Sequence, residues 1–358
     1  MEMLIPEAPA NASQFSTQVK AGELLNQLTC NKFDFSEKDI SGGIFSQITF
    51  KHCTFSSTNL EQCLFNQCKF IDCQFINLTC AEVNFIEAEF IDCQFSNSKL
   101  TQFNFIQSHL QATRFLNSEI ISGVFQQCNL SNAVFLKVNM HTAVFNECQL
   151  YEAEYKQCTL LRTTLNNCDW GKNTINECQF ELIFVTKANL AGIDFSGMQL
   201  SQSQLIECDL KGCDFSNCQL EQSAFTGSDI QKCNFTGANM EMTNLYEANL
   251  SGVQFNSAIL NQASMQKATM LGCDFSNAKL EMAQLKEASI TLCIFNKAKL
   301  VYSDLSNSFI SECDFSHADV YMAKMHESFD EKCVWSGANK SSAQGTNEQL
   351  KKAEQWGK

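Results

Sequence analysis

The chain carries a large apolar residue at every fifth position over most of its length. The series starts at Phe35 and continues without an insertion to Met325. Asp330 is the first exception, and Trp335 restores the pattern once. A period of five fits neither the 3.6-residue repeat of a helix nor the two-residue repeat of a strand. It indicates a chain that turns a corner every five residues and places one large side chain inside on each side of a square coil.

A second period of 20 residues accompanies the first. Every twentieth residue from Phe35 is almost always aromatic, whereas the neighbouring column from Ile40 is mostly aliphatic. Because four sides of five residues complete one coil, residues 20 apart are expected to stack on one another. At the strand spacing of about 4.8 Å, about 15 coils would form a rod about 72 Å long.

Cysteine has one regular place in this pattern. All of the 20 cysteines except Cys30 and Cys80 lie two residues before a large apolar position, where Ala, Ser, Thr and Gly also occur. We interpret them as small core residues. In CDLKGCDFSNC, residues 208–218, successive cysteines would point inward from different sides, and their spacing is not typical of zinc sites. The sequence predicts no metal site, and disulfides are not expected in a cytosolic protein.

Several repeats resemble those of the pentapeptide-repeat family, whose motif is A(D/N)LXX with Cys and Phe variants. The matching stretches include ANLSG (248–252), CDFSN (213–217 and 273–277) and CNFTG (233–237). The resemblance covers about residues 33–335 and implies an all-β fold, a right-handed quadrilateral β-helix. It implies much less about function.

The segments outside the repeats are expected to cover the ends of the β-helix. Residues 1–32 form an N-terminal capping segment, with a helix predicted over 13–28. Residues 336–358 form a polar C-terminal tail, with a short helix predicted over 347–356 and capped by Asn347. The five side chains expected to face the first coil are Phe15, Val19, Leu24, Leu25 and Leu28.

One zone of the repeats is irregular. Between Trp170 and Ile193, a small position is taken by Asn173, and the pattern turns Leu182 and Phe184 outward. A bend in the coil and a contact surface both explain this zone, and the sequence does not choose between them.

No catalytic constellation is visible, so we expect neither an enzyme nor a cofactor. The five histidines fall on outward positions of different coils, where we expect them to be solvent-exposed, and none has a partner for nucleophilic catalysis. Asp214, Asp274 and Asp314 precede large residues, where Asp and Asn make local turn hydrogen bonds. No glycine-rich phosphate-binding loop is present.

The net charge of -14 argues against direct binding of nucleic acid or anionic membranes, because both are bound mainly by Lys and Arg. A basic protein partner is compatible with it. The N-terminus, MEMLIPEAPA, lacks the features of a secretory signal, and the chain has no apolar run of about 18 residues. We therefore expect no transmembrane segment and a cytoplasmic location, with signal-independent export left open.

These observations favour a non-catalytic, rigid scaffold for protein–protein interaction. The sequence identifies neither its partner nor its oligomeric state, and a homodimer is one possibility. The family resemblance implies two further hypotheses: an accessory or effector role in bacterial type VI secretion, and DNA mimicry toward a type II topoisomerase with quinolone resistance. Residues 33–335 carry 34 acidic and 19 basic side chains. That net charge is only about a third of the charge on about 72 Å of duplex DNA.

Two outward surfaces are candidate partner-binding sites. The first combines two columns that follow the same large inward residues, and Met and Tyr recur in it although neither is needed there for structure. Its candidate residues are Met242, Met282, Tyr302, Met322, Val301, Tyr321, Glu241 and Glu281. The second surface consists of aliphatic pairs 20 residues apart: Ile71 with Ile91, Ile86 with Ile106, and Leu116 with Leu136.

Overall fold

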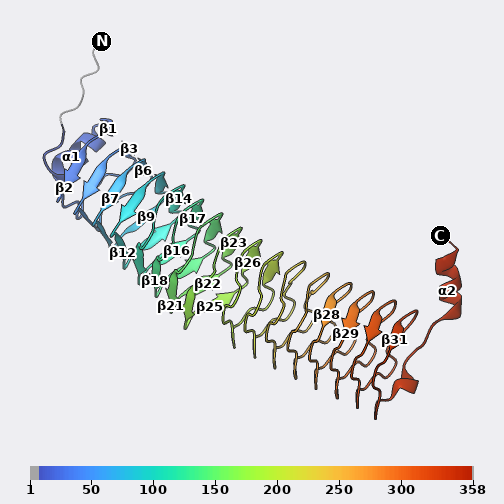
Figure 1. Cartoon of the computed structure of the whole chain (residues 1–358). Coiled ribbons are helices and arrows are strands. Elements are labelled where there is room, and N and C mark those ends of the chain that lie inside the picture. Colours follow the sequence, from blue (N-terminus) through green and yellow to red (C-terminus); the bar gives the residue numbers. More distant parts are fainter. Residues whose placement is uncertain (1–7, 357–358) are drawn as a thin grey trace. The chain divides into compact units, whose positions relative to one another are not determined.

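A computed structural model describes residues 8–356 of the chain. The first seven residues of the expected N-terminal capping segment and the last two of the expected C-terminal tail lie outside the described residues. The chain divides into two compact units, the first ending at Phe180 and the second beginning at Glu181. Each unit is an all-parallel β-solenoid, as Figure 1 shows, which confirms the predicted β-helix.

In the first unit, four parallel ladders form the four sides of the coil, and paired residues are 20 apart in every ladder. One ladder contains β1 (Leu25–Asn26), β3 (Ile44–Ser46), β6 (Leu64–Asn66), β10 (Asn84–Ile86), β14 (Asn104–Ile106), β17 (Val124–Gln126), β20 (Val144–Asn146) and β23 (Thr164–Asn166). The next contains β2 (Thr29–Asn31), β4 (Thr49–Lys51), β7 (Lys69–Ile71) and β11 (Glu89–Ile91). The third contains β5 (Thr54–Ser56), β8 (Gln74–Ile76), β12 (Gln94–Ser96), β15 (Arg114–Leu116), β18 (Val134–Leu136), β21 (Glu154–Lys156) and β24 (Thr174–Asn176). The fourth contains β9 (Thr79–Ala81), β13 (Lys99–Thr101), β16 (Glu119–Ile121), β19 (Asn139–His141) and β22 (Thr159–Leu161), and β25 (Gln179–Glu181) follows at the end of the unit.

The ladder register explains the two exceptional cysteines. Cys30 pairs with Phe50, and Cys80 pairs with Leu100, so both occupy the large inward position rather than the small one. Leu25 likewise pairs with Phe45 and is buried. The five-residue pattern therefore already holds at Leu25, and the solenoid begins before residue 33, where we expected its first coil.

A helix, α1 (Ala12–Lys20), covers the start of the first unit. Asn11 caps it by accepting a hydrogen bond from the Gln14 backbone N–H, and Phe15 is fully buried against the rings of Phe35 and Phe45. The helix expected over 13–28 is thus shorter than predicted, because Gly22 adopts a left-handed φ of 76° and the chain then enters β1. Leu24 is exposed instead of facing the first coil.

The second unit keeps the 20-residue register but has fewer strands. Its strands are β26 (Phe184–Thr186), β27 (Gln204–Ile206), β28 (Thr269–Leu271), β29 (Ser289–Thr291), β30 (Phe309–Ser311) and β31 (Phe329–Glu331). Single bridges such as Asp214 to Asn234 replace strands elsewhere. Asp or Asn precedes the large residue at many of these bridges, and both are poor strand formers that bond the backbone two residues ahead.

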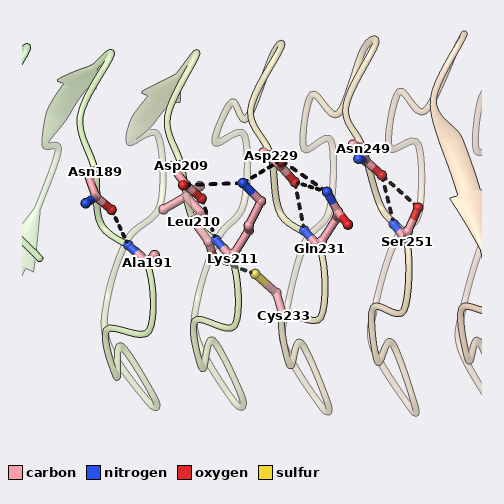
Figure 2. Close-up of polar contacts among 10 residues, drawn as sticks. All are labelled: Asn189, Ala191, Asp209, Leu210, Lys211, Asp229, Gln231, Cys233, Asn249 and Ser251. Carbon is pink, nitrogen blue, oxygen red and sulfur yellow. Dashed lines mark hydrogen bonds and ion pairs between the residues drawn. The ribbon is translucent and has the colours of Figure 1, made fainter.

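Figure 2 shows these turns in four successive coils of the second unit. Asn189 and Asn249 each accept a hydrogen bond from the backbone N–H two residues later, at 3.1 and 3.2 Å. Lys211 lies between Asp209 and Asp229, 3.4 and 3.0 Å from their carboxylates. Burial opposes ionisation of Asp229, but hydrogen bonds from Lys211 and Gln231 outweigh it and hold the pKa of this carboxyl below its usual value.

The expected turn role of the aspartates is confirmed. Asp214, Asp274 and Asp314 each accept a hydrogen bond of 2.8 Å from the backbone N–H two residues later. Each carboxylate therefore stabilises the turn in which it lies.

The buried cysteines contribute hydrogen bonds as well as volume. The thiol of Cys233 donates to the Leu210 carbonyl of the preceding coil at 2.9 Å (Figure 2), and Cys218 donates to Phe195 at 2.8 Å. Thr58 and Ser228 make the same bond across 23 residues. This shared bond explains in physical terms why Cys alternates with Ser and Thr at the small position.

The last coil ends on a charged pair. Asp330 takes the inward position, where its carboxylate contacts Lys340, and the Lys340 ammonium lies over the Trp335 ring. A 3₁₀ helix, η1 (Lys340–Ser342), and α2 (Glu348–Gln355) follow. Asn347 precedes α2 and accepts hydrogen bonds from the Gln349 and Leu350 backbone N–H groups.

Replacing Phe235 by Ala is expected to lower the free energy of unfolding by about 3 to 5 kcal/mol. Phe235 is fully buried and stacks between Phe215 and Phe255, with ring centroids 4.9 and 5.4 Å away. Urea denaturation would measure the change. Cys213→Ala is the control, expected to cost about 1 kcal/mol; equal losses for the two variants would contradict the column assignment.

We also expect the solenoid to lose stability in alkali. Burial raises the pKa of the Cys68 and Cys208 thiols from 9.0 to about 11, and that of Cys218 to about 12. The folded chain therefore keeps protons that the unfolded chain releases above pH 9, so this stability is complete below that pH and falls as the pH rises through the folded values. Melting temperatures measured from pH 7 to 11 should show the fall. A variant with Ala at positions 208 and 218 should show a smaller fall, and an equal fall would contradict the role of these thiols.

Candidate functional site

The predicted Met and Tyr residues do lie together on the second unit, at one corner and along the side before it. We call Met242, Met282, Tyr302 and Met322, with the neighbouring Val301 and Tyr321, the Met–Tyr strip. The four corner residues have left-handed φ values between 55° and 58°. A left-handed φ is usual at the corners of this chain, but most corners hold polar residues such as Gln, Glu, Asn and Lys. Turn geometry therefore does not explain why Met and Tyr are there.

Backbone hydrogen bonds between coils hold the two columns of the strip in register. The Met282 N–H donates to Val301 at 2.9 Å, and the Tyr302 N–H donates to Tyr321 at 3.0 Å. The Tyr302 and Tyr321 rings meet edge to face, with centroids 5.9 Å apart. Both rings are 48% exposed, and Met282 is 51% exposed. The strip thus presents ordered aromatic and thioether groups to solvent.

The charged residues beside the strip include two lysines in addition to the expected glutamates. Glu241 and Glu281 lie in its side column, as predicted. The ladder also places Lys279 and Lys299 next to one another on the same side of the coil, between Ile259 and Asp319. Both lysines are exposed. The sequence contains this signal, because the two lysines are 20 residues apart at the position before the large residue.

The second predicted surface is not one surface. Its three pairs do stack, since Ile71 pairs with Ile91, Ile86 with Ile106, and Leu116 with Leu136. However, β7 and β11, β10 and β14, and β15 and β18 belong to three different ladders. The pairs therefore lie on three sides of the coil, and all six side chains are half-buried.

An aromatic pair that the sequence reasoning missed lies on another side of the second unit. Phe309 and Phe329 occupy the outward position before the large residue, and their rings stack with centroids 5.2 Å apart. They are 45% and 51% exposed. Phenylalanine at a position that otherwise favours polar turn residues was the available signal. Phe184, which the sequence pattern turns outward, also directly precedes a large inward residue and is 38% exposed.

Two histidines are not exposed as expected: His141 is half-buried and His326 is buried. His326 is buried because α2 packs against it. Its Nδ1 accepts a hydrogen bond of 3.0 Å from the Asn347 backbone N–H, so Nε2 carries the proton of the neutral ring and lies 3.2 Å from Glu354. A pocket of about 300 Å³ lies beside it, with Lys286 and Lys324 in its lining. The partners of His326 are 21 and 28 residues away, outside the repeat period.

Within residues 8–356, no group of three or more His, Cys, Asp or Glu side chains is placed to hold a metal ion. In the same part of the chain, no helix has the length and apolar character needed to cross a bilayer. The chemistry that the described surfaces offer is that of contact: aromatic, thioether and charged groups on a regular ladder.

Several solved structures are similar to this chain. HetL, a pentapeptide repeat protein involved in heterocyst differentiation regulation in the cyanobacterium Nostoc sp. strain PCC 7120, is 21% identical over 52% of this chain and 89% of its own, with a TM-score of 0.20. Trypsin-treated QnrB1, a plasmid-mediated fluoroquinolone resistance protein, is 19% identical over 56% and 88%, with a TM-score of 0.32. A pentapeptide repeat protein of the Arabidopsis thaliana thylakoid lumen is 23% identical over 36% and 65%, with a TM-score of 0.12. At these identities and TM-scores, the likenesses carry no inference about function.

A comparison with curated protein sequences finds no match. Two protein-family models do match. The pentapeptide repeat region matches residues 138–214 and 208–272. The model of eight pentapeptide repeats matches residues 44–77, 68–107, 88–120, 254–291 and 293–328. Together they cover most of the residues that carry the five-residue pattern, and the chain belongs to the pentapeptide-repeat family.

Proposed function

We propose that this protein is a non-catalytic scaffold that binds a protein partner through the Met–Tyr strip. The observation that carries the proposal is the left-handed corner column of Met242, Met282, Tyr302 and Met322. Within residues 8–356, the other large apolar residues at left-handed corners are Leu182 and Leu292, whereas this column holds four. Their recurrence along one column is best explained by what they contact outside the chain.

The strip also has the chemistry of a protein interface. Tyrosine and methionine are enriched in interface cores, and tyrosine offers a large contact area at a low cost in conformational entropy. Glu241 and Glu281 directly precede Met242 and Met282, and Lys279 and Lys299 lie on the same side beside Met282 and Tyr302. A matching partner would carry basic groups opposite the glutamates and acidic groups opposite the lysines, around an apolar centre.

Type VI secretion is a setting in which such a scaffold could act, and DNA mimicry is an alternative function. A role in type VI secretion rests on family resemblance alone. DNA mimicry requires a long run of uninterrupted negative charge, and here lysines interrupt the acidic columns. Lys69 pairs with Glu89 at 2.8 Å, and Lys211 contacts both Asp209 and Asp229. This pattern favours the scaffold over the mimic.

Replacing Tyr302 and Met322 by Ser should weaken partner capture at least tenfold, because it removes the aromatic pair and one thioether. A pull-down from the native host, quantified by mass spectrometry against the wild type, would measure the loss. Leu292→Ser is the matched control, since Leu292 is an exposed apolar corner residue with a φ of 56° on another side of the coil. Recovery of the same proteins by the double variant and the wild type would contradict the proposal.

We further expect stoichiometric protein to leave DNA gyrase supercoiling unchanged, because the lysine-interrupted surface does not reproduce the charge of duplex DNA. A gel assay of supercoiled plasmid at increasing protein concentration would test this. Inhibition near one protein per enzyme would make topoisomerase binding the leading function instead.

A further inference from the structure

The parallel ladder on one side of the second unit stops at an open strand. β28, β29, β30 and β31 form a four-stranded sheet in that order, so β31 is the last strand of the sheet within residues 8–356. The residue 20 positions after Phe329 is Gln349, which lies in α2 rather than in a further strand. α2 contacts His326 and Glu327, at the corner that precedes β31, and Phe329 keeps half of its surface exposed.

The existing register defines what a further strand would meet. Phe309 pairs with Phe329, Ile310 with Asp330, and Ser311 with Glu331. The Phe329 N–H donates to the Ser308 carbonyl, and the Glu312 N–H donates to the Glu331 carbonyl, both at 2.9 Å. By the same pattern, the Asp330 and Lys332 N–H groups and the Ser328 carbonyl face the open side. They can pair with an added parallel strand as in other edge-strand complexes.

We propose that β31 binds an extended peptide segment of a partner protein, and that this segment carries an aromatic residue followed two positions later by Lys or Arg. The first side chain of the segment would stack on the outer face of Phe329 and extend the Phe309–Phe329 column. The third would lie over Glu331. The middle side chain would point inward toward Asp330, whose carboxylate contacts Lys340, so a small or polar residue fits there.

The local charge selects a basic segment. At the ends of β30 and β31, the carboxylates are Glu312, Glu327 and Glu331 and the lysines are Lys332 and Lys351, and Lys351 lies 2.7 Å from Glu327. Lys332 lies 3.8 Å from Glu312 and 3.7 Å from Glu331 with an exposed side chain. Exposed pairs of this length contribute little. A Lys or Arg of the partner can therefore compete with Lys332 for Glu331.

The inward Asp330 gives the edge its specificity. Open strand edges bind apolar segments indiscriminately, and inward-pointing charged residues suppress such pairing. The Asp330 carboxylate would be covered by the middle residue of any added strand, so a segment with an apolar middle residue is rejected. The edge is thereby restricted to segments of the proposed pattern.

This surface is independent of the Met–Tyr strip. The strip follows the side that contains residues 299–301, whereas β30 is two sides further along the coil, at 309–311. The two surfaces can therefore be tested separately, and two partners can be held by one unit.

The test uses the full-length protein and a ten-residue peptide with Tyr-Ser-Lys at its centre and Ser and Thr on both sides. Isothermal titration calorimetry should show saturable binding, and Phe329→Ser should weaken it at least tenfold. Phe184→Ser is the control, because Phe184 is also a partly exposed Phe before a large residue, and it should bind as the wild type does. No saturable binding to the wild type, or equal binding to Phe329→Ser with an unchanged melting curve, would overturn the proposal.

Two further arms test the strand geometry and the charge. N-methylation of the peptide Tyr removes the N–H that would donate to Ser328 and should abolish binding, whereas N-methylation of the central Ser, whose N–H would point away from β31, should be tolerated. Glu331→Lys should reverse the preference toward a Tyr-Ser-Glu peptide. Equal effects of the two N-methyl groups, or no reversal, would exclude the proposed register. If instead the wild type sediments as a dimer and Phe329→Ser as a monomer, the edge binds a second copy of this chain and the proposal is wrong.

Discussion

The in-register parallel ladder, in which each residue meets the residue 20 positions later, is the constraint on which the rest of this structure depends. Backbone hydrogen bonds between coils hold the inward residues in register, so similar residues stack along most of each column. The Phe275, Phe295 and Phe315 rings follow one another at 4.8 and 4.6 Å, nearly parallel. The same register determines the outer surface, because each outward residue lies next to the residue 20 positions later. Surface columns are therefore as regular as core columns, and the candidate sites are sets of columns.

Most of the fold could be predicted because the ladder requires residue types that repeat every five and every 20 positions in the sequence. The five-residue series identified the sides, and the 20-residue series identified the stacks, including the pairs Ile71 with Ile91 and Phe215 with Phe235. The end of the regular pattern at Asp330 was also visible. What the period could not show was how the ends are covered. α1 stops at Lys20, and α2 buries His326, through contacts that occur once and so leave no repeated signal.

The candidate surfaces were only partly predictable for the same reason. A column is a one-dimensional pattern, so the Met–Tyr strip could be assembled from the sequence. Whether three columns share a side depends on their position within the coil. The aliphatic pairs of the first unit separate onto three ladders, and Lys279 and Lys299 join the side of the strip. Phe309 and Phe329 were not predicted as a surface because Asn189, Asp209, Asp229 and Asn249 form turns at the same position of earlier coils.

The uninterrupted count has a consequence for how the outer surfaces are related to one another. An insertion of five residues within the second unit would keep every large residue inward, but it would stack the aromatic column of Phe275 and Phe295 on an aliphatic one. It would also advance all later residues by one side, a quarter turn about the coil. An insertion between Met282 and Tyr302 would thus separate the thioether from the tyrosines while each stayed exposed. The inward-outward alternation survives any multiple of five, but the stacked columns, both inside and outside, survive only multiples of 20. The position of an outward column around the coil therefore depends on the number of residues that precede it. A binding surface made of several coils persists only if insertions and deletions between those coils are multiples of 20.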